Sequence, residues 1–527
     1  MKNINEGSDL TQKLLSGVNK LSTAVGSTLG PRGRNVLIRE KDRPPFITKD
    51  GVTVAKHFSL EDPIEDAVAE IVKQVSRRTN SEAGDGTTTS TVLARALYEG
   101  SIDTLREDST ISPIQLSRGL DKVVSKVLKE ATDFVKEIAT LDDIRHVATV
   151  SSNNDESIGN LIATAVDKVG HEGSITIEES RTSETSLELV EGFRLDSGYA
   201  SSSFVTDERK RTLFYENPMF LVTDSKIDAI DQILPSLEIA ARESRPFVVV
   251  CEDIEGQALA ALIMNSARGT MKVAAIKAPG YGEERRQVLE DLAVSVGAKF
   301  FQRVNGEKIQ NISLKDFGNA KSIMCSNVDS VITDGDTDQA KLVQRVESLV
   351  EQIKAADLKE AEPLARRLIR LQSSIATIKV GGNSEIEVTE KRHRIEDALE
   401  AVRSAQEEGI VAGGSSCYRS LARALTKATP EEYDLTAEQA PCLAIVADAL
   451  NYPTAVMASN SGLSACETID IINSEDGFDF LALEKCNLYE RGIIDPFKVI
   501  RVSLKNATSV AKTLLTTNVS IVEDASN

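Results

Sequence analysis

The sequence predicts a multidomain protein of mixed α and β structure, in which mostly helical ends flank an α/β middle. Three observations support this fold class: the length of 527 residues, the helical spacing of apolar residues at both ends, and the alternation of strand and helix patterns between them. A chain this long exceeds what one hydrophobic core usually serves, so two to four domains are expected. The content of 41% hydrophobic and 27% charged residues is typical of a soluble globular protein.

The first 150 residues are expected to be mainly helical. Leu14, Val18, Leu21 and Val25 recur at helical spacing, and Gly30-Pro31 ends the pattern. Further helical patterns cover residues 66–79, 88–98 and 114–138.

The middle of the chain alternates between strand and helix patterns. Strands are predicted at residues 174–178, 219–223, 246–251 and 272–277, and helices between them at 230–241 and 257–266. This alternation favours an α/β domain with partly parallel strand pairing.

Helical patterns return after the middle. Residues 338–372 resemble a charged helical hairpin, and residues 392–408 form an amphipathic helix with Ile395, Leu399 and Val402 on one face. Gly409 suits the position after the end of that helix. The last hundred residues are again helical, so the two ends are expected to form one domain with the middle inserted.

Composition disfavours several classes of function. A formal charge of −20 repels nucleic-acid phosphates, and no long basic run offsets it. The sequence pattern predicts no stretch long and apolar enough to span a bilayer, and the polar N-terminus lacks a signal-peptide core, so a cytoplasmic location is expected. No Cys-x-x-Cys pair occurs, so buried reduced thiols are expected at all six cysteines.

The most informative segment is Gly84-Asp85-Gly86-Thr87-Thr88-Thr89, which precedes a helical pattern. Glycines let the backbone approach a phosphate, and the free N–H groups at a helix start attract anions. Asp85 offers the oxygen ligands that Mg²⁺ prefers. Taken alone, the segment is explained as well by a threonine-rich helix cap after a flexible turn.

Three other turns accompany it. Residues 28–35 end the first helix with a glycine-rich turn, residues 47–54 place Asp50 in a turn before an alternating run, and residues 411–414 form a third turn. No Gly-Lys dipeptide occurs, which excludes a P-loop, and no Gly-x-Gly-x-x-Gly links a strand to a helix.

Together these motifs resemble GroEL-type (group I) chaperonins. The resemblance rests on TLGPRGRN, ITKDGVTVA, EAGDGTTTSTVLA, IKAPG, IEDAL, EEGIVAGG and GIIDP, in this order, from about Leu14 to about Thr517. It implies an ATP-dependent chaperone that forms a ring chamber, binds non-native proteins and promotes their folding.

The resemblance also implies site residues. Asp50 and Asp397 would position and activate the attacking water, and Asp85 would bind Mg²⁺. The remaining nucleotide contacts would come from Thr28, Leu29, Gly30, Pro31, Lys49, Gly86, Thr87, Thr88, Thr89, Ser151, Gly414, Asp479, Ile493 and Asp495. Asp397 lies on the amphipathic helix of a small domain, so hydrolysis would wait for that domain to close.

The same resemblance predicts the domains and the client surface. An equatorial domain would comprise residues 1–133 and 408–527, an intermediate domain 134–190 and 376–407, and an apical domain 191–375. The apical groove would be lined by Tyr199, Phe204, Leu234, Leu237, Leu259, Ile263 and Met264. Leu234 and Leu237 are expected to share one helix face, as are Leu259 and Ile263. Without the family, such apolar stripes are more often core.

Several positions depart from the family pattern. Ser203 replaces an aromatic residue near Phe204, and Ser373-Ser374 replaces a glycine pair at the second hinge, whereas the first hinge glycine, Gly192, is kept. Asp479-Phe480-Leu481 stands where adenine is commonly contacted, and Ser415 replaces the third glycine of a turn. These changes predict a divergent member.

The expected partners are unfolded clients and further copies of the chain, seven to a ring, in one or two rings. The family leaves room for a co-chaperonin lid and for K⁺ beside ATP and Mg²⁺; neither nucleic acid nor a membrane is expected. The alternative is a ring-shaped holdase or scaffold with a weakened or lost ATP cycle. A third hypothesis is an ATP-dependent enzyme that acts on a small molecule. The sequence shows no second group of residues that would bind such a substrate.

Overall fold

The fold is described from a computed structural model. It describes residues 2–39, 45–170, 175–180, 182–208, 211–337, 339–355, 364, 367–368, 370–371 and 374–523. The chain forms two compact units, unit 1 (residues 1–164 and 381–527) and unit 2 (residues 165–380). Unit 1 therefore combines both ends of the chain, as expected, while the finer division into three domains stays a prediction.

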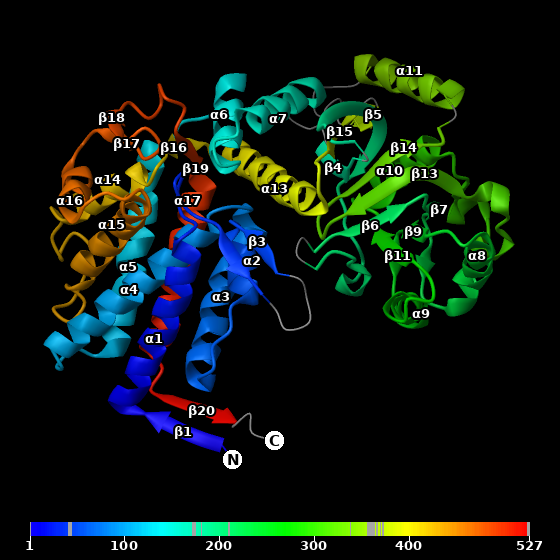
Figure 1. The fold of residues 1–527 in the computed structure, drawn as a ribbon. Coiled ribbons are helices and arrows are strands. Elements are labelled where there is room, and N and C mark those ends of the chain that lie inside the picture. Colours follow the sequence, from blue (N-terminus) through cyan, green and yellow to red (C-terminus); the bar gives the residue numbers. More distant parts are fainter. Residues whose placement is uncertain are drawn as a thin grey trace. The chain divides into compact units, whose positions relative to one another are not determined.

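Unit 1 is mainly helical (Figure 1). Its helices are α1 (Gly7–Gly26), α2 (Gly51–His57), α3 (Pro63–Ala83), α4 (Thr87–Glu107), α5 (Pro113–Glu130), α6 (Leu141–Ser151), α13 (Glu385–Glu408), α14 (Ser416–Leu425), α15 (Cys442–Asn460), α16 (Ala465–Asn473) and α17 (Phe497–Leu515). Helix α7 (Glu156–Val169) runs from unit 1 into unit 2.

Short antiparallel strand pairs complete unit 1. They are β1 (Lys2–Glu6) with β20 (Val519–Glu523), β2 (Val36–Ile38) with β3 (Phe46–Thr48), β16 (Ile410–Ala412) with β19 (Ile494–Pro496), and β17 (Gly477–Asp479) with β18 (Glu484–Cys486). The first pair joins the two ends of the chain.

The core of unit 1 follows the predicted helical spacing. Leu14, Val18, Leu21 and Val25 of α1 are all buried, and α1 packs on α3 and α4 while α17 packs on α3, α4 and α5. Helix α3 starts earlier than its apolar pattern because the Asp62 side chain accepts hydrogen bonds from the first backbone N–H groups.

Unit 2 is built on one ten-stranded mixed sheet. Its main path runs β11 (Val273–Lys277), β9 (Phe247–Cys251), β7 (Met219–Thr223), β13 (Gly318–Cys325), β14 (Ser330–Gly335), β5 (Ser186–Leu195), β15 (Ser374–Val380) and β4 (Ile175–Glu179), with β12 (Phe300–Phe301) beside β7 and β6 (Leu213–Glu216) beside β13. Strands β11, β9 and β7 are parallel, which confirms the expected partly parallel pairing.

Helices α8 (Ile230–Glu243), α9 (Gly256–Ala267), α10 (Gly282–Val296) and α11 (Gln339–Ala355) belong to unit 2, with a small parallel pair, β8 (Lys226–Ile227) and β10 (Asp253–Ile254). The four predicted strands at 174–178, 219–223, 246–251 and 272–277 correspond to β4, β7, β9 and β11. The first arm of the predicted hairpin is α11, whereas most of its second arm lies outside the described residues.

Helix α2 covers a run whose residues alternate in polarity. The alternating run after Asp50 is the helix α2, because the Asp50 carboxylate accepts hydrogen bonds from the backbone N–H groups of Val52 and Thr53 at 3.1 and 3.0 Å. Such a cap stabilises a helix start and overrides the strand preference of valine and threonine.

Helix α15 also differs from expectation. By length and composition it is apolar enough to cross a membrane, yet 61% of that window is buried inside the structure. Its buried residues include Leu443, Val446 and Leu450, which join the core cluster of unit 1. The helix is therefore explained as a core helix.

The predicted first hinge residue, Gly192, lies in β5 at a place without room for a side chain. An added Cβ would stand 1.8 Å from Cδ1 of Ile375 and 2.7 Å from the carbonyl oxygen of Ile332. The glycine is thus required by close packing. Of the predicted second hinge, Ser374 begins β15 and Ser373 lies outside the described residues.

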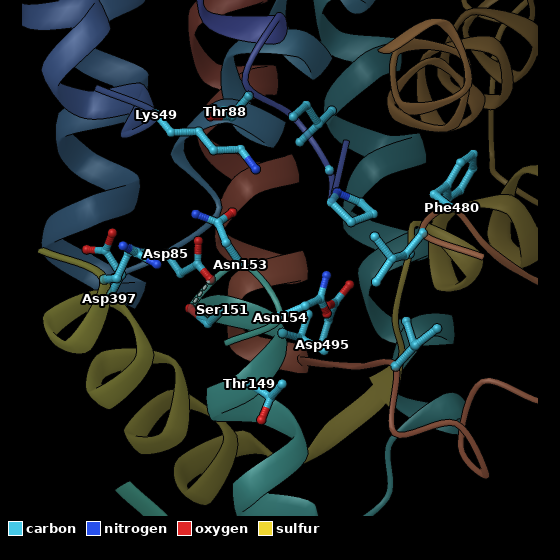
Figure 2. A pocket seen from close by; sticks show the side chains of 18 of the residues that line it. Lys49, Asp85, Thr88, Thr149, Ser151, Asn153, Asn154, Asp397, Phe480 and Asp495 are labelled. Carbon is cyan, nitrogen blue, oxygen red and sulfur yellow. Dashed lines mark hydrogen bonds between the residues drawn. The ribbon is translucent and has the colours of Figure 1, made fainter. Parts of the chain in front are cut away.

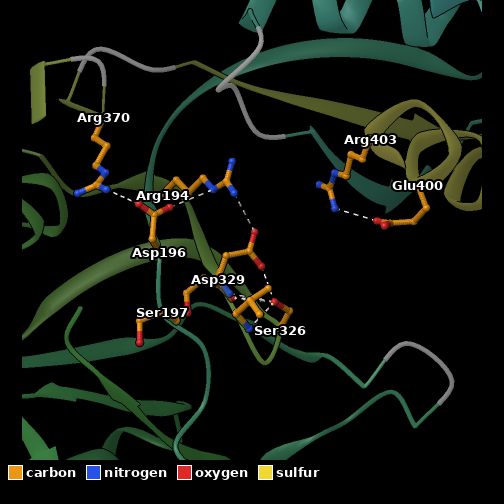
Figure 3. Close-up of polar contacts among 10 residues, drawn as sticks. Arg194, Asp196, Ser197, Ser326, Asp329, Arg370, Glu400 and Arg403 are labelled. Atoms are coloured by element: carbon orange, nitrogen blue, oxygen red, sulfur yellow. Dashed lines mark hydrogen bonds and ion pairs between the residues drawn. The ribbon is translucent and has the colours of Figure 1, made fainter. Parts of the chain in front are cut away.

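A charge network follows β5. Arg194 reaches Asp196 and Asp329 with N···O distances of 3.6 Å each, and Arg370 also pairs with Asp196 (Figure 3). Asp329 in turn accepts a hydrogen bond from the Ser326 hydroxyl in the turn between β13 and β14. The network ties that turn and the segment around Arg370 to the end of β5.

Candidate functional site

One pocket of about 760 Å³ lies in unit 1. It brings together all of the predicted nucleotide-site residues, although they come from positions 28 to 495: Thr28, Leu29, Gly30, Pro31, Lys49, Asp50, Asp85, Gly86, Thr87, Thr88, Thr89, Ser151, Asp397, Gly414, Asp479, Ile493 and Asp495. Figure 2 shows Asp85 and Asp397 on one side of the view and Phe480 on the other.

The turn between α3 and α4 needs its glycines. Gly84 and Gly86 have φ of +70° and +80°, in the left-handed region that side chains disfavour. A Cβ on Gly84 would lie 2.1 Å from Cβ of Glu400, and one on Gly86 would lie 2.5 Å from Cγ1 of Val499. The turn therefore fits closely against α13 and α17, and it directs the N-terminus of α4 into the pocket.

Asp85 is held in place by two hydrogen bonds. Its carboxylate accepts from the Ser151 hydroxyl at 2.9 Å and from the Gly86 backbone N–H at 2.5 Å (Figure 2). Burial raises the pKa of Asp85, and the negative charge of Asp50 adds to this. A cation beside these two carboxylates would offset the cost of keeping Asp85 ionised, so the donor set fits Mg²⁺ held by carboxylate, water and phosphate oxygens.

Asp50 is fixed by the helix that it caps. Besides the two backbone N–H groups, the Thr53 hydroxyl donates to its carboxylate at 2.5 Å. A Cβ on Gly51 would lie 2.3 Å from Oγ1 of Thr88. Asp50 is thereby brought against the threonine run, a proximity that the separate motifs did not reveal.

Lys49 supplies a positive charge to the pocket. Burial lowers the pKa of its ammonium group, the nearby Arg394 lowers it further, and Glu390 opposes the shift. Arg394 and Glu390 form an i,i+4 ion pair of 3.0 Å on α13, the helix that also carries Asp397. Helix α13 thus brings both charge and a candidate catalytic carboxylate to the pocket.

The turn after α1 forms another wall. Thr28 is buried, and its hydroxyl donates to the Val25 carbonyl at 2.8 Å and lies 3.4 Å from the Thr88 hydroxyl. Gly30 has φ of +84°, and a Cβ there would lie 2.9 Å from Cγ of Met457. The turn is therefore confined between α4 and α15.

The third turn meets strand β19. The Gly413 N–H donates to the Ile493 carbonyl at 3.0 Å, and a Cβ on Gly413 would lie 3.1 Å from Oδ1 of Asp495. Burial raises the pKa of Asp495 to about 7, the charge of Asp85 adds to the shift, and a hydrogen bond from Gly414 opposes it. Ser415 follows with φ of +62°, so this departure from glycine retains the left-handed conformation.

The departure at residues 479–481 is accommodated locally. Oδ1 of Asp479 accepts from the N–H groups of Leu481 and Ala482 at 2.7 and 3.1 Å, which closes the turn after β17. Phe480 is 3% exposed and packs edge-on against Phe478 at a centroid distance of 5.0 Å. The aromatic ring therefore forms an apolar wall continuous with Met457.

Comparison with known proteins identifies the family. The model of the TCP-1/cpn60 chaperonin family matches residues 21–525. The chain is a member of this chaperonin family. That match confirms the resemblance seen in the sequence.

Solved structures confirm the fold of the chaperonin. Two crystal structures of the chaperonin gp146 from the bacteriophage EL 2 (Pseudomonas aeruginosa), both in the presence of ATP-BeFx, superpose with TM-scores of 0.68 and 0.63. Each is 23% identical in sequence, and each alignment covers 99% of both chains.

Sequence reasoning missed part of the chaperonin's pocket. Asn153 and Asn154, directly after α6, line it with φ of +65° and +62°, and Figure 2 shows both near Ser151. His146 also lines the pocket and packs against Gly492, where an added Cβ would lie 2.4 Å from Cδ2 of the ring. The tolerance of asparagine for the left-handed region was the available signal.

The predicted client surface is only partly exposed. Leu234 and Met264 are 42% and 50% exposed, whereas Phe204 and Leu237 are 0% and 7% exposed and belong to the core of unit 2. Leu234 and Leu237 therefore do not present one exposed face, because Leu237 packs into the core cluster of unit 2. Partly buried side chains complete the set: Tyr199, Leu259 and Ile263.

The cysteine prediction holds for four of the six thiols. Those of Cys251, Cys325, Cys417 and Cys442 are buried, and burial raises the pKa of each to about 12. Cys466 is exposed and Cys486 is half-buried, so the prediction was wrong for these two.

Proposed function

We propose that this chaperonin is an ATP-driven folding machine whose nucleotide site is the unit 1 pocket. The supporting observation is that one pocket collects every nucleotide-site residue that the motifs implied, from both ends of the chain. The related phage chaperonin was crystallised with an ATP analogue, which supports the same ligand class.

Different parts of the pocket bind different parts of the nucleotide. The N-terminus of α4 and the turn at residues 28–31 bind the phosphates through backbone N–H groups and hydroxyls. Asp85 would hold Mg²⁺, which when bound would supply positive charge beside the phosphates. The apolar wall around Phe480 and Met457 receives the base, while Asp495 and the turn at Gly414 bind the ribose.

Hydrolysis needs a positioned water more than a covalent intermediate. Asp397 accepts the proton of that water, and Asp50, fixed by its three hydrogen bonds, orients it. Lys49 provides positive charge beside the phosphates.

The clients are non-native proteins, which are bound without recognition of a particular sequence motif. Leu234 and Met264, together with the partly exposed Leu259 and Ile263, offer apolar contact on α8 and α9, which lie against each other. The proposed assembly is a heptameric ring, one or two rings per particle, with room for a co-chaperonin lid.

Steady-state ATP hydrolysis tests the proposal. Asp397→Ala is expected to lower kcat by about 100-fold or more, the usual contribution of a general base, while ATP binding is retained. Glu385→Ala is the matched control, because Glu385 is an exposed acid in the first turn of the same helix and lies outside the pocket. Absence of turnover in the unaltered protein, with clients still bound, would instead establish the holdase alternative.

Electron microscopy tests the assembly. Purified protein with ATP is expected to give sevenfold top views. Top views without sevenfold symmetry would contradict the proposed ring.

A further inference from the structure

The end of helix α15 contacts the turn after α1 at two points. Nδ2 of Asn460, the last residue of α15, donates to the carbonyl oxygens of Gly26 and Leu29, both at 2.9 Å. One turn earlier, Met457 fills the space beside Gly30. Asn460 itself does not line the pocket, so it contacts the site only through this turn.

The direction of these two hydrogen bonds is fixed by chemistry. Both partners are backbone carbonyls, which only accept, so the donating amide nitrogen of Asn460 must face them. The Gly26 carbonyl belongs to the last turn of α1, where carbonyls lack partners within the helix. Asn460 donates a hydrogen bond to that carbonyl from outside α1 and at the same time holds Leu29 in the turn.

The turn carries the groups that face the phosphates. The Leu29 N–H donates to the same Gly26 carbonyl at 3.1 Å, and Thr28 and Gly30 flank Leu29 in the pocket wall. The amide of Asn460 therefore bridges the end of α1 to the centre of the turn. Besides this bridge, the turn is held by the side chain of Met457, by the contact between the Thr28 and Thr88 hydroxyls and by its local hydrogen bonds.

We propose that Asn460 is a positioning residue for nucleotide binding, which preorganises the turn at residues 28–31 through its two hydrogen bonds. The inference rests on the proposed function of the pocket. When the binding-competent conformation is populated only in part, the apparent dissociation constant rises by the inverse of that fraction. Once the nucleotide is bound the turn is ordered, so kcat should be retained.

The test uses the full-length protein and two variants. Asn460→Asp keeps the shape but replaces the donor by a carboxylate facing two carbonyls, and Asn460→Ala removes the bonds without repulsion. KM for ATP is expected to rise about tenfold or more for Asn460→Asp and several-fold for Asn460→Ala, with kcat within about twofold of the unaltered protein. Asn518→Asp, at an exposed residue outside the pocket, controls for the added charge.

The outcomes separate the inference from the function. A merely structural role would lower the melting temperature and leave KM of the folded protein unchanged, and that result would overturn the inference. If Asn460→Asp does not fold, the KM of Asn460→Ala decides by the same criterion. Failure of the unaltered protein to bind ATP would overturn the proposed function and the inference together.

Discussion

The contact between Gly84 and α13 gives the sharpest test of how the site is built. Replacing Gly84 by alanine forces a side chain into φ of +70° and places its Cβ 2.1 Å from Cβ of Glu400 and 2.8 Å from its Cγ. The left-handed conformation costs about 1–2 kcal/mol for a residue other than glycine. Overpacking against a Cβ that cannot swing away adds about 1–3 kcal/mol, so the total destabilisation should be about 2–5 kcal/mol.

Gly462→Ala is the matched control for Gly84→Ala. Gly462 has φ of +79° but no atom within 4 Å of an added Cβ, so it should lose only the conformational share of about 1–2 kcal/mol. Urea denaturation followed by circular dichroism measures both losses. Since Glu400 lies one turn from Asp397 on α13, Gly84→Ala should also lower kcat for ATP, whereas Gly462→Ala should not. Equal stability losses and an unchanged kcat would refute the reasoning.

Two further predictions concern the metal and the thiols. Chelation of divalent cations should abolish ATP turnover, and added Mg²⁺ should restore it. Because Asp85 is the expected protein ligand, Asp85→Ala should raise the Mg²⁺ concentration required for half-maximal activity by about tenfold or more. Turnover that persists in chelator would contradict this prediction. In thiol titration of the native protein at pH 8, Cys466 should react first and Cys486 more slowly. The four buried thiols, with pKa values of about 12 where burial disfavours the thiolate, should react only on unfolding. Four or more fast equivalents in native protein would contradict the buried assignment.

The glycine turns that line the pocket could be predicted because their conformational requirements are local. Gly30, Gly84 and Gly86 all adopt the left-handed region, and only glycine enters it freely. A glycine at such a position indicates this conformation directly. The order of the motifs indicated that the turns belong to one site. The core positions of α1 were likewise predictable, since their spacing matches one buried helix face.

Other features depend on contacts that the sequence does not record. The run after Asp50 alternates like a strand, yet the capping carboxylate makes it a helix. The family pattern predicts Phe204 and Leu237 at a surface, whereas both are buried in the core cluster of unit 2. The two hydrogen bonds of Asn460 could not be predicted because their acceptors lie more than 400 residues away in the chain.

Binding of ATP in the unit 1 pocket can be observed in a cryo-electron microscopy map of the protein with Mg²⁺ and a slowly hydrolysed ATP analogue. Density for the phosphates is expected beside residues 85–89, and density for the base beside Phe480, in every subunit. Saturating analogue with this pocket empty, or nucleotide density elsewhere on the chain, would contradict it.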